Sequence, residues 1–255
     1  MTFPVWIGIG GWRIHPHLFF ELLGYAVSAT WYWLDRNRRG DRVSTAQRWS
    51  LSAAAIAGAV IGSRVLFWLE DPHQTLDRLA DIQHLVGGQT IVGGLLGGWL
   101  AVEWQKRRLG ITQPTGDLLA LPIVLGTAVG RIGCFLSGLP DGTYGIATAL
   151  PWGIDLGDGL RRHPVALYET LFLVLLAAAL IRFQRRARVG DVFLALMAAY
   201  FAFRLAIEFL KPGVALLAGL TAIQWAAAAG LVMAWRVWSR RRHAPLRATE
   251  SGYTL

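Results

Sequence analysis

The sequence predicts an all-α integral membrane protein that crosses the bilayer several times. Of its 255 residues, 54% are hydrophobic and only 16% are charged, and the mean hydropathy is +0.42. Ordinary soluble domains carry about 25% charged residues. The apolar residues also fall into stretches of about 20, the length that a helix needs to cross a bilayer. We therefore expect one transmembrane helical domain over residues 1–255.

Seven apolar stretches follow one another along the chain. We predict that each is a crossing, at about residues 17–34, 47–69, 87–104, 116–137, 164–182, 190–210 and 214–236. With seven crossings the two termini lie on opposite sides of the membrane. No basic segment precedes the first stretch and the basic run 36–42 follows it, so we expect it to remain a helix and not to be a cleaved signal.

Lysine and arginine are distributed unevenly between the connections. Five lie on one side, and seventeen lie on the other, in segments 35–48, 105–115 and 182–189 and in the tail from residue 236. Cytoplasmic connections carry the excess of these residues. We therefore expect the N-terminus outside, an external loop at 138–163 and a cytoplasmic basic tail at 237–255. The protein is expected in the inner membrane of a bacterial cell.

The net charge of +9 is explained by this bias and predicts affinity for anionic membrane lipids. A soluble basic face is missing, so we expect no nucleic-acid partner. The single cysteine, Cys134, excludes an internal disulfide, and no Cys/His cluster has zinc spacing. The sequence therefore predicts neither a metal nor a cofactor.

Three arginines lie inside predicted crossings: Arg64, Arg131 and Arg204. Each is about 20 to 24 Å from the cytoplasmic start of its helix, at ~1.5 Å per residue, which puts all three in the outer third of the bilayer. Charged side chains at such positions are expensive and usually functional, and guanidinium groups bind phosphate bidentately. We expect a phosphate-binding site. Alternatively, Arg204 pairs with Glu208 one turn on, and Arg64 extends towards the interface.

Glycine pairs begin the third predicted crossing. Gly94 and Gly98 have the spacing of close helix packing. Gly87 and Gly88 lie earlier, where backbone N–H groups are expected to be free for an anion.

The long 138–163 segment is expected to be functional. Candidates near it are Asp141, His163, Tyr168 and Glu169. His163 is the candidate general base, because histidine titrates near neutral pH; the alternative is a residue that only begins a helix.

Three motifs in this sequence resemble those of the prolipoprotein diacylglyceryl transferase family. Residues 130–138, GRIGCFLSG, are similar to the family's Gly-Arg-x-Gly-Asn-Phe-x-Asn-Gly, and residues 163–169, HPVALYE, to its His-Pro-x-x-x-Tyr-Glu. Residues 203–211, FRLAIEFLK, are similar to Arg-Phe-x-x-Glu-Phe-x-Arg. Thr221 and Gln224 match the Leu-Thr-x-x-Gln of the last helix. Together the resemblances cover most of the chain.

The resemblance implies a reaction. The diacylglyceryl group of phosphatidylglycerol passes to the lipobox cysteine of a prolipoprotein signal peptide, and glycerol phosphate leaves. Arg131, Arg204 and His163 are then the expected catalytic residues. The expected lipid-binding residues are Arg64, Arg131, Arg204, Glu208, Gly87, Gly88, Tyr168 and Glu169.

The sequence departs from the family pattern at three positions. Val92 stands where the family has a histidine, and Cys134 and Ser137 replace two signature asparagines. Valine gives no help to a thiol that must ionise. A relative without catalysis that binds anionic lipid or lipoprotein precursors is therefore the alternative, and a small-solute transporter is a third possibility.

Overall fold

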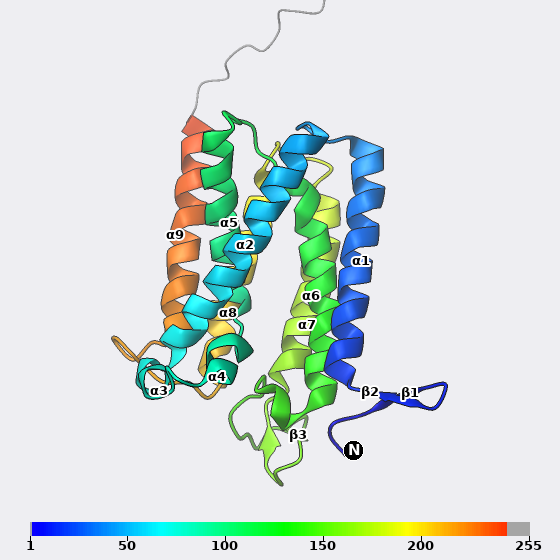
Figure 1. Cartoon of the computed structure of the whole chain (residues 1–255), viewed down its shortest axis with the longest axis vertical. Helices are drawn as coiled ribbons and strands as arrows, with labels where there is room; N and C mark the ends of the chain where they lie inside the picture. The colour runs from blue at the N-terminus through cyan, green and yellow to red at the C-terminus, as the bar shows by residue number, and fades with distance from the viewer. Residues whose placement is uncertain (1, 244–255) are drawn as a thin grey trace, which may run out of the picture.

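The computed structural model describes residues 2–243, and its long helices lie side by side in one bundle (Figure 1). Their bounds are α1 Pro16–Arg39, α2 Thr45–Glu70, α5 Ile91–Arg108, α6 Asp117–Ser137, α7 Val165–Phe183, α8 Asp191–Ile207 and α9 Ala222–His243. The connections hold α3 Pro72–Asp77, α4 Ile82–Gly87, 3-10 turns at Leu139–Asp141 and Glu208–Leu210, and two antiparallel hairpins, β1 Ile7–Ile9 with β2 Trp12–Ile14 and β3 Ile154–Asp155 with β4 Arg161–Arg162.

Within residues 2–243, four helices are long and apolar enough to cross a membrane: α2, α6, α7, and α8 with the 3-10 turn that follows it. The prediction of an all-α membrane protein is therefore confirmed at this level. The other three predicted crossings correspond to α1, α5 and α9. Each ends in several basic residues, for example Lys106, Arg107 and Arg108 in the last turn of α5. The count of seven crossings stays a prediction.

Helices α2 and α5 approach closely through glycine. A Cβ added to Gly58 or Gly62 of α2 would overlap with the backbone of α5, and the reverse holds for Gly93 and Gly97. Small residues four apart permit this approach. Gly94 and Gly98, which the sequence indicated, also face α2, where an added Cβ would lie 3.7 Å from the carbonyl oxygen of Ala59 and 3.2 Å from that of Ala55, but the tightest approach is one position earlier. Successive residues point about 100° apart around a helix. Gly93 and Gly97, the first glycine of each pair, face the point where α5 crosses α2.

Helix α1 packs against α6, which is distant in sequence. A Cβ on Gly24 would lie 2.7 Å from the carbonyl oxygen of Gly126, and the Ser28 hydroxyl donates to the carbonyl oxygen of Pro122 at 2.8 Å. The central core lies where α6, α7 and α8 meet, and α9 covers α8. The most deeply buried large side chains there include Leu173, Leu196, Met197, Tyr200 and Phe201.

The two ends of the bundle differ in composition. The basic last turns of α1, α5 and α7 lie at one end, which we call the basic end. The opposite end carries α3, α4, both hairpins and the 138–163 segment, and we call it the loop end (Figure 1). This is the grouping of connections that the charge distribution predicts.

Two predicted boundaries need correction. The third predicted stretch begins at residue 87, but α5 begins at Ile91, because the Thr90 hydroxyl caps it by accepting from the N–H of Gly93 at 3.2 Å. The last stretch begins at 214, but residues 216–220 form a hydrogen-bonded turn and α9 starts at Ala222. Helix α9 then runs to His243, so part of the predicted tail is helical; residues 244–255 lie outside the described part.

Candidate functional site

Two arginines and two glutamates form a buried network near the loop end. Nε of Arg131 on α6 lies 2.9 Å from Oε2 of Glu169 on α7. The same oxygen is 3.6 Å from Nη1 of Arg204 on α8, and Nη2 of Arg204 donates to Glu208 at 2.9 Å. No residue of the four is more than 8% exposed. Their charges balance, as is usual for ionised side chains inside an apolar bundle.

Arg204 and Glu208 are four residues apart, about one helix turn, and the ion pair between them confirms the contact that this spacing predicts. The central position of Glu169 was not predicted, and Tyr200 was missed. The Tyr200 hydroxyl donates to Oε1 of Glu169 at 2.6 Å. The signal for Tyr200 was present, since residues 200, 204 and 208 are four apart and share one helix face.

The guanidinium groups of Arg131 and Arg204 have more N–H donors than their ion pairs use. Each carries five N–H donors, and Nη1 of Arg131 also approaches the Cys134 sulfur at 3.6 Å. Nε of Arg131 faces Oε2 of Glu169 at 2.9 Å without hydrogen-bond alignment, and within residues 2–243 the buried Nε of Arg204 has no hydrogen-bond partner. Such donors are rare in a folded protein unless a ligand, an ion or water completes them. The two guanidinium groups therefore retain N–H donors beyond those in their ion pairs.

Arg64 lies apart from this network. Its Nη1 donates to the carbonyl oxygen of Gly88 at 3.2 Å, so Gly88 contributes an acceptor to an arginine. A side chain on Gly88 would overlap with Phe67, and Gly87 is the last residue of α4. Glu169 contacts both Arg131 and Arg204, whereas across the described residues Arg64 shares no hydrogen-bond or ion-pair partner with either of them. The structure thus brings together two of the three internal arginines.

His163 and Tyr168 contact each other at the loop end. Nδ1 of His163 is 3.3 Å from the Tyr168 hydroxyl, which also accepts from Nε1 of Trp152 at 2.8 Å. Tyr168 and Glu169 are successive helix residues and point in different directions. Glu169 enters the arginine network, whereas Tyr168 faces the 138–163 loop. Both His163 and Tyr168 are half-buried.

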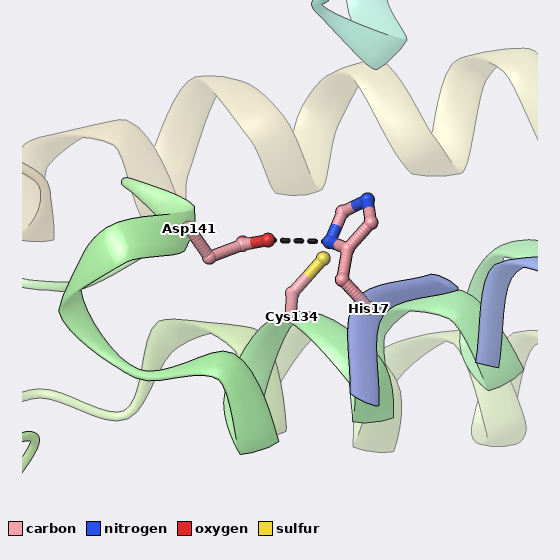
Figure 2. A group of neighbouring side chains, drawn as sticks. All are labelled: His17, Cys134 and Asp141. Atoms are coloured by element: carbon pink, nitrogen blue, oxygen red, sulfur yellow. Dashed lines mark hydrogen bonds and ion pairs between the residues drawn. The ribbon is translucent and has the colours of Figure 1, made fainter. Parts of the chain in front are cut away.

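Asp141, the other loop candidate, contacts α1. Its Oδ1 lies 2.5 Å from Nδ1 of His17, with the Cys134 sulfur beside them (Figure 2). Burial raises the pKa of the Asp141 carboxyl, but hydrogen bonds from His17 and Thr143 outweigh it and hold that pKa below its usual value. Asp141 is therefore a carboxylate and a poor proton acceptor.

Val92 lies in the first turn of α5 and is only 1% exposed. Its side chain belongs to the central core. The family pattern has a histidine at this position. In this chain the side chain at this position packs in the core instead.

Lys211 was also missed as a member of the charged region. It follows the 3-10 turn after α8. Burial, and next the positive charge of Arg204, lower the pKa of its ammonium group.

A cavity of about 690 Å³ opens among α2, α5, α8 and α9. Most of its lining is apolar. Ser63 and Thr90 lie towards its loop end, and Arg236, Arg240 and Arg241 towards its basic end. Neither Arg131 nor Arg204 lines it, so the cavity and the arginine network are separate features.

Comparisons with known proteins agree with these motifs. A model of the prolipoprotein diacylglyceryl transferase family matches residues 4–239. The phosphatidylglycerol--prolipoprotein diacylglyceryl transferase of Bordetella bronchiseptica is 34% identical over 241 residues, which cover 87% of this chain and 88% of the relative.

Two further relatives carry the same name. The protein of Vibrio vulnificus is 33% identical over 224 residues, covering 82% of this chain and 78% of its own. The protein of Clostridium tetani is 27% identical over 216 residues, covering 82% and 85%. The family match includes the whole of α6, α7 and α8, the helices that carry the arginine network. The chain belongs to the prolipoprotein diacylglyceryl transferase family.

Proposed function

We propose that this chain transfers the diacylglyceryl group of phosphatidylglycerol to the lipobox cysteine of a prolipoprotein signal peptide. The observation that carries the proposal is the buried network of Arg131, Glu169, Arg204 and Glu208. Its members come from three separate sequence motifs, and each motif resembles one of the family. The relatives' shared name describes the same reaction.

The reaction has an anionic leaving group. The acceptor sulfur forms a bond to the glyceryl carbon, the bond from that carbon to the phosphate oxygen breaks, and glycerol phosphate leaves. Fixed positive groups that face the departing oxygen lower the barrier. Arg131 and Arg204 would hold the phosphate through the donors that Glu169 and Glu208 leave free. Glu169 would orient both guanidinium groups.

The acceptor thiol must lose its proton. We propose His163 as the base, since it lies at the loop end on the motif that also supplies Glu169. Glu169 itself is a poor candidate, because two arginines stabilise its ionised form. The Tyr168 hydroxyl, 3.3 Å from His163, would orient the imidazole ring.

We also propose the membrane arrangement in which these groups work. All seven long helices cross the bacterial inner membrane, with the N-terminus and loop end outside and the basic end in the cytoplasm. The grouping of basic helix ends at one end of the bundle supports this orientation. Secreted precursors and lipid headgroups would then meet the arginine network from outside. The apolar cavity of about 690 Å³ would receive an acyl chain of a membrane lipid.

A second candidate function follows from Val92. Because this position is a packing position, a relative that binds anionic lipid or lipoprotein precursors without catalysis is the alternative. The two candidates predict the same lipid binding and differ in product formation.

The test uses the purified full chain in nanodiscs containing phosphatidylglycerol. A lipobox peptide is added, and mass spectrometry follows diacylglyceryl peptide while an enzymatic assay follows glycerol phosphate. Equal amounts of both products are expected, and none from a peptide with serine for the lipobox cysteine. Lipid binding without either product would overturn the transferase proposal in favour of the non-catalytic candidate.

A further inference from the structure

Three side chains from distant parts of the sequence converge at the loop end. His17 comes from the first turn of α1, Cys134 from the last turn of α6, and Asp141 from the 3-10 turn that follows α6. Figure 2 shows the imidazole, the sulfur and the carboxylate pointing towards one another. The close packing of α1 on α6 brings His17 to the other two.

The three groups offer one nitrogen, one sulfur and one oxygen. These atoms all lie within 4.8 Å of one another, and the His17 nitrogen is 2.5 Å from the Asp141 oxygen. The Asp141 side chain is 5% exposed and Cys134 is buried, whereas the His17 side chain is 45% exposed. The cluster is therefore held by two buried groups and opens outwards on the histidine side.

The geometry differs from that of a catalytic relay. In a Cys-His-Asp relay the nucleophile and the acid contact opposite nitrogens of the imidazole. Here Asp141 contacts Nδ1 of His17, and the sulfur lies towards the same edge of the ring (Figure 2). Three donor atoms directed at one point, from a soft thiolate, an imidazole and a carboxylate, are the set that divalent zinc prefers.

Neighbouring groups support the three donors from outside. The Thr143 hydroxyl donates to the second oxygen of Asp141, and Nε2 of His17 lies 3.8 Å from a carboxylate oxygen of Glu21. Nη1 of Arg131 lies 3.6 Å from the Cys134 sulfur. Metal ligands are commonly oriented by such outer contacts.

We propose that His17, Cys134 and Asp141 bind one divalent zinc-class cation, with Nδ1, Sγ and a carboxylate oxygen as ligands. Three protein ligands leave the fourth tetrahedral position for water or an external ligand. The thiolate and the carboxylate balance the two charges of the cation. The site lies next to Arg131 and does not depend on the proposed transferase activity.

The single cysteine makes this site easy to measure. The full chain is purified with a tag that contains no histidine, stripped with a chelator, and titrated with Co²⁺. A near-ultraviolet thiolate-to-cobalt band can come only from Cys134. We expect this band to saturate at one Co²⁺ per chain and to disappear when Zn²⁺ is added.

Three substitutions and one control test the ligand set. Cys134→Ser should abolish the band, and His17→Asn and Asp141→Asn should each weaken Zn²⁺ affinity by more than the 10- to 100-fold typical of outer-shell partners. His73→Asn, on α3, should bind like the wild type. Because His17 is partly exposed, His17→Asn is expected to fold, and its thermal unfolding is recorded alongside. A wild-type protein without a saturable band, or a band unchanged in His17→Asn, would overturn the proposal.

Discussion

Arg131 on α6 and Glu169 on α7 form an ion pair of 2.9 Å, and Glu169 is only 3% exposed. Breaking such a buried pair leaves an uncompensated charge and typically costs about 3 to 5 kcal/mol. The pair therefore fixes the register between two family motifs that lie on either side of the 138–163 loop. It also positions the guanidinium group that we propose for the donor phosphate.

Replacing either network arginine by lysine should impair transfer. Arg131→Lys and Arg204→Lys keep the charge but lose the planar fork that holds an oxyanion with two donors. Loss of one such stabilising donor typically lowers kcat by about 10² to 10³. The measurement is the transfer rate in nanodiscs, with exposed Arg78→Lys as the matched control. Full transfer and lipid binding by both variants would contradict the phosphate site.

His163→Ala should slow transfer by at least about 10², the lower range for a general base, while phosphatidylglycerol binding stays unchanged. Tyr168→Phe removes the hydroxyl 3.3 Å from His163 and should give a smaller loss. Transfer rates are compared across neutral pH, with His73→Ala as the control. A wild-type rate for His163→Ala would exclude this residue as the base.

Val92→His places a polar ring at a position that is 1% exposed. We expect it to destabilise the fold by about 1 to 3 kcal/mol, the usual cost of overpacking a core, and not to raise the transfer rate. Thermal unfolding and transfer are measured together, and Val92→Leu controls for size. If the wild type were inactive and Val92→His active, the chain would be the non-catalytic relative.

Acid should weaken the connection between α1 and α2. Burial raises the pKa of the Asp41 carboxyl, but hydrogen bonds from Arg48 at 2.8 and 2.6 Å outweigh it, and the pKa is lowered. A carboxyl with a lowered folded-state pKa stabilises above its unfolded pKa, and this contribution is lost as the pH falls through the folded value. We expect the free energy of unfolding to fall by about 1 to 3 kcal/mol on acidification.

The measurement is thermal unfolding in detergent from pH 7 to pH 3. Asp41→Asn should be less stable at pH 7 and should show a smaller loss on acidification. Equal pH dependence of the variant and the wild type would assign the effect to other carboxylates.

The proposed topology predicts the access of single cysteines. On a Cys134→Ser background, Thr148→Cys in the 138–163 loop should react with an impermeant maleimide added outside. Gln113→Cys, at the basic end, should react only after the membrane is opened. The reverse pattern would invert the orientation.

The sequence predicted the charged network in part, because its signals are local. Arg204 and Glu208 are four residues apart on one helix, and family motifs indicated Arg131 and Glu169. What joins them is the packing of α6, α7 and α8, which a list of crossings does not specify. Equal depth likewise did not indicate that Arg64 would contact Gly88. The depth of a residue in the membrane is only one of its coordinates. Which residues are its neighbours also depends on how the helices are arranged side by side.

The cluster in Figure 2 was beyond sequence reasoning for the same reason. His17 and Asp141 are separated by 124 positions, so no metal-ligand spacing exists in the sequence. The glycine pairs show a finer limit. The pattern indicated close packing at α5, but the choice between neighbouring glycines depends on which side of α5 meets α2.

The α1–α6 contact has a consequence for biosynthesis. Helix α1 leaves the ribosome about 100 residues before α6 is complete, an interval of roughly 5 to 20 s at ~5–20 residues per second. During this time Gly24 and the Ser28 hydroxyl have no helix to contact, and lipid or the insertion machinery must cover them. Helices α2 and α5 are both synthesised within the same interval. The α2–α5 pair can therefore assemble first, and α1 is the early helix that waits for its partner.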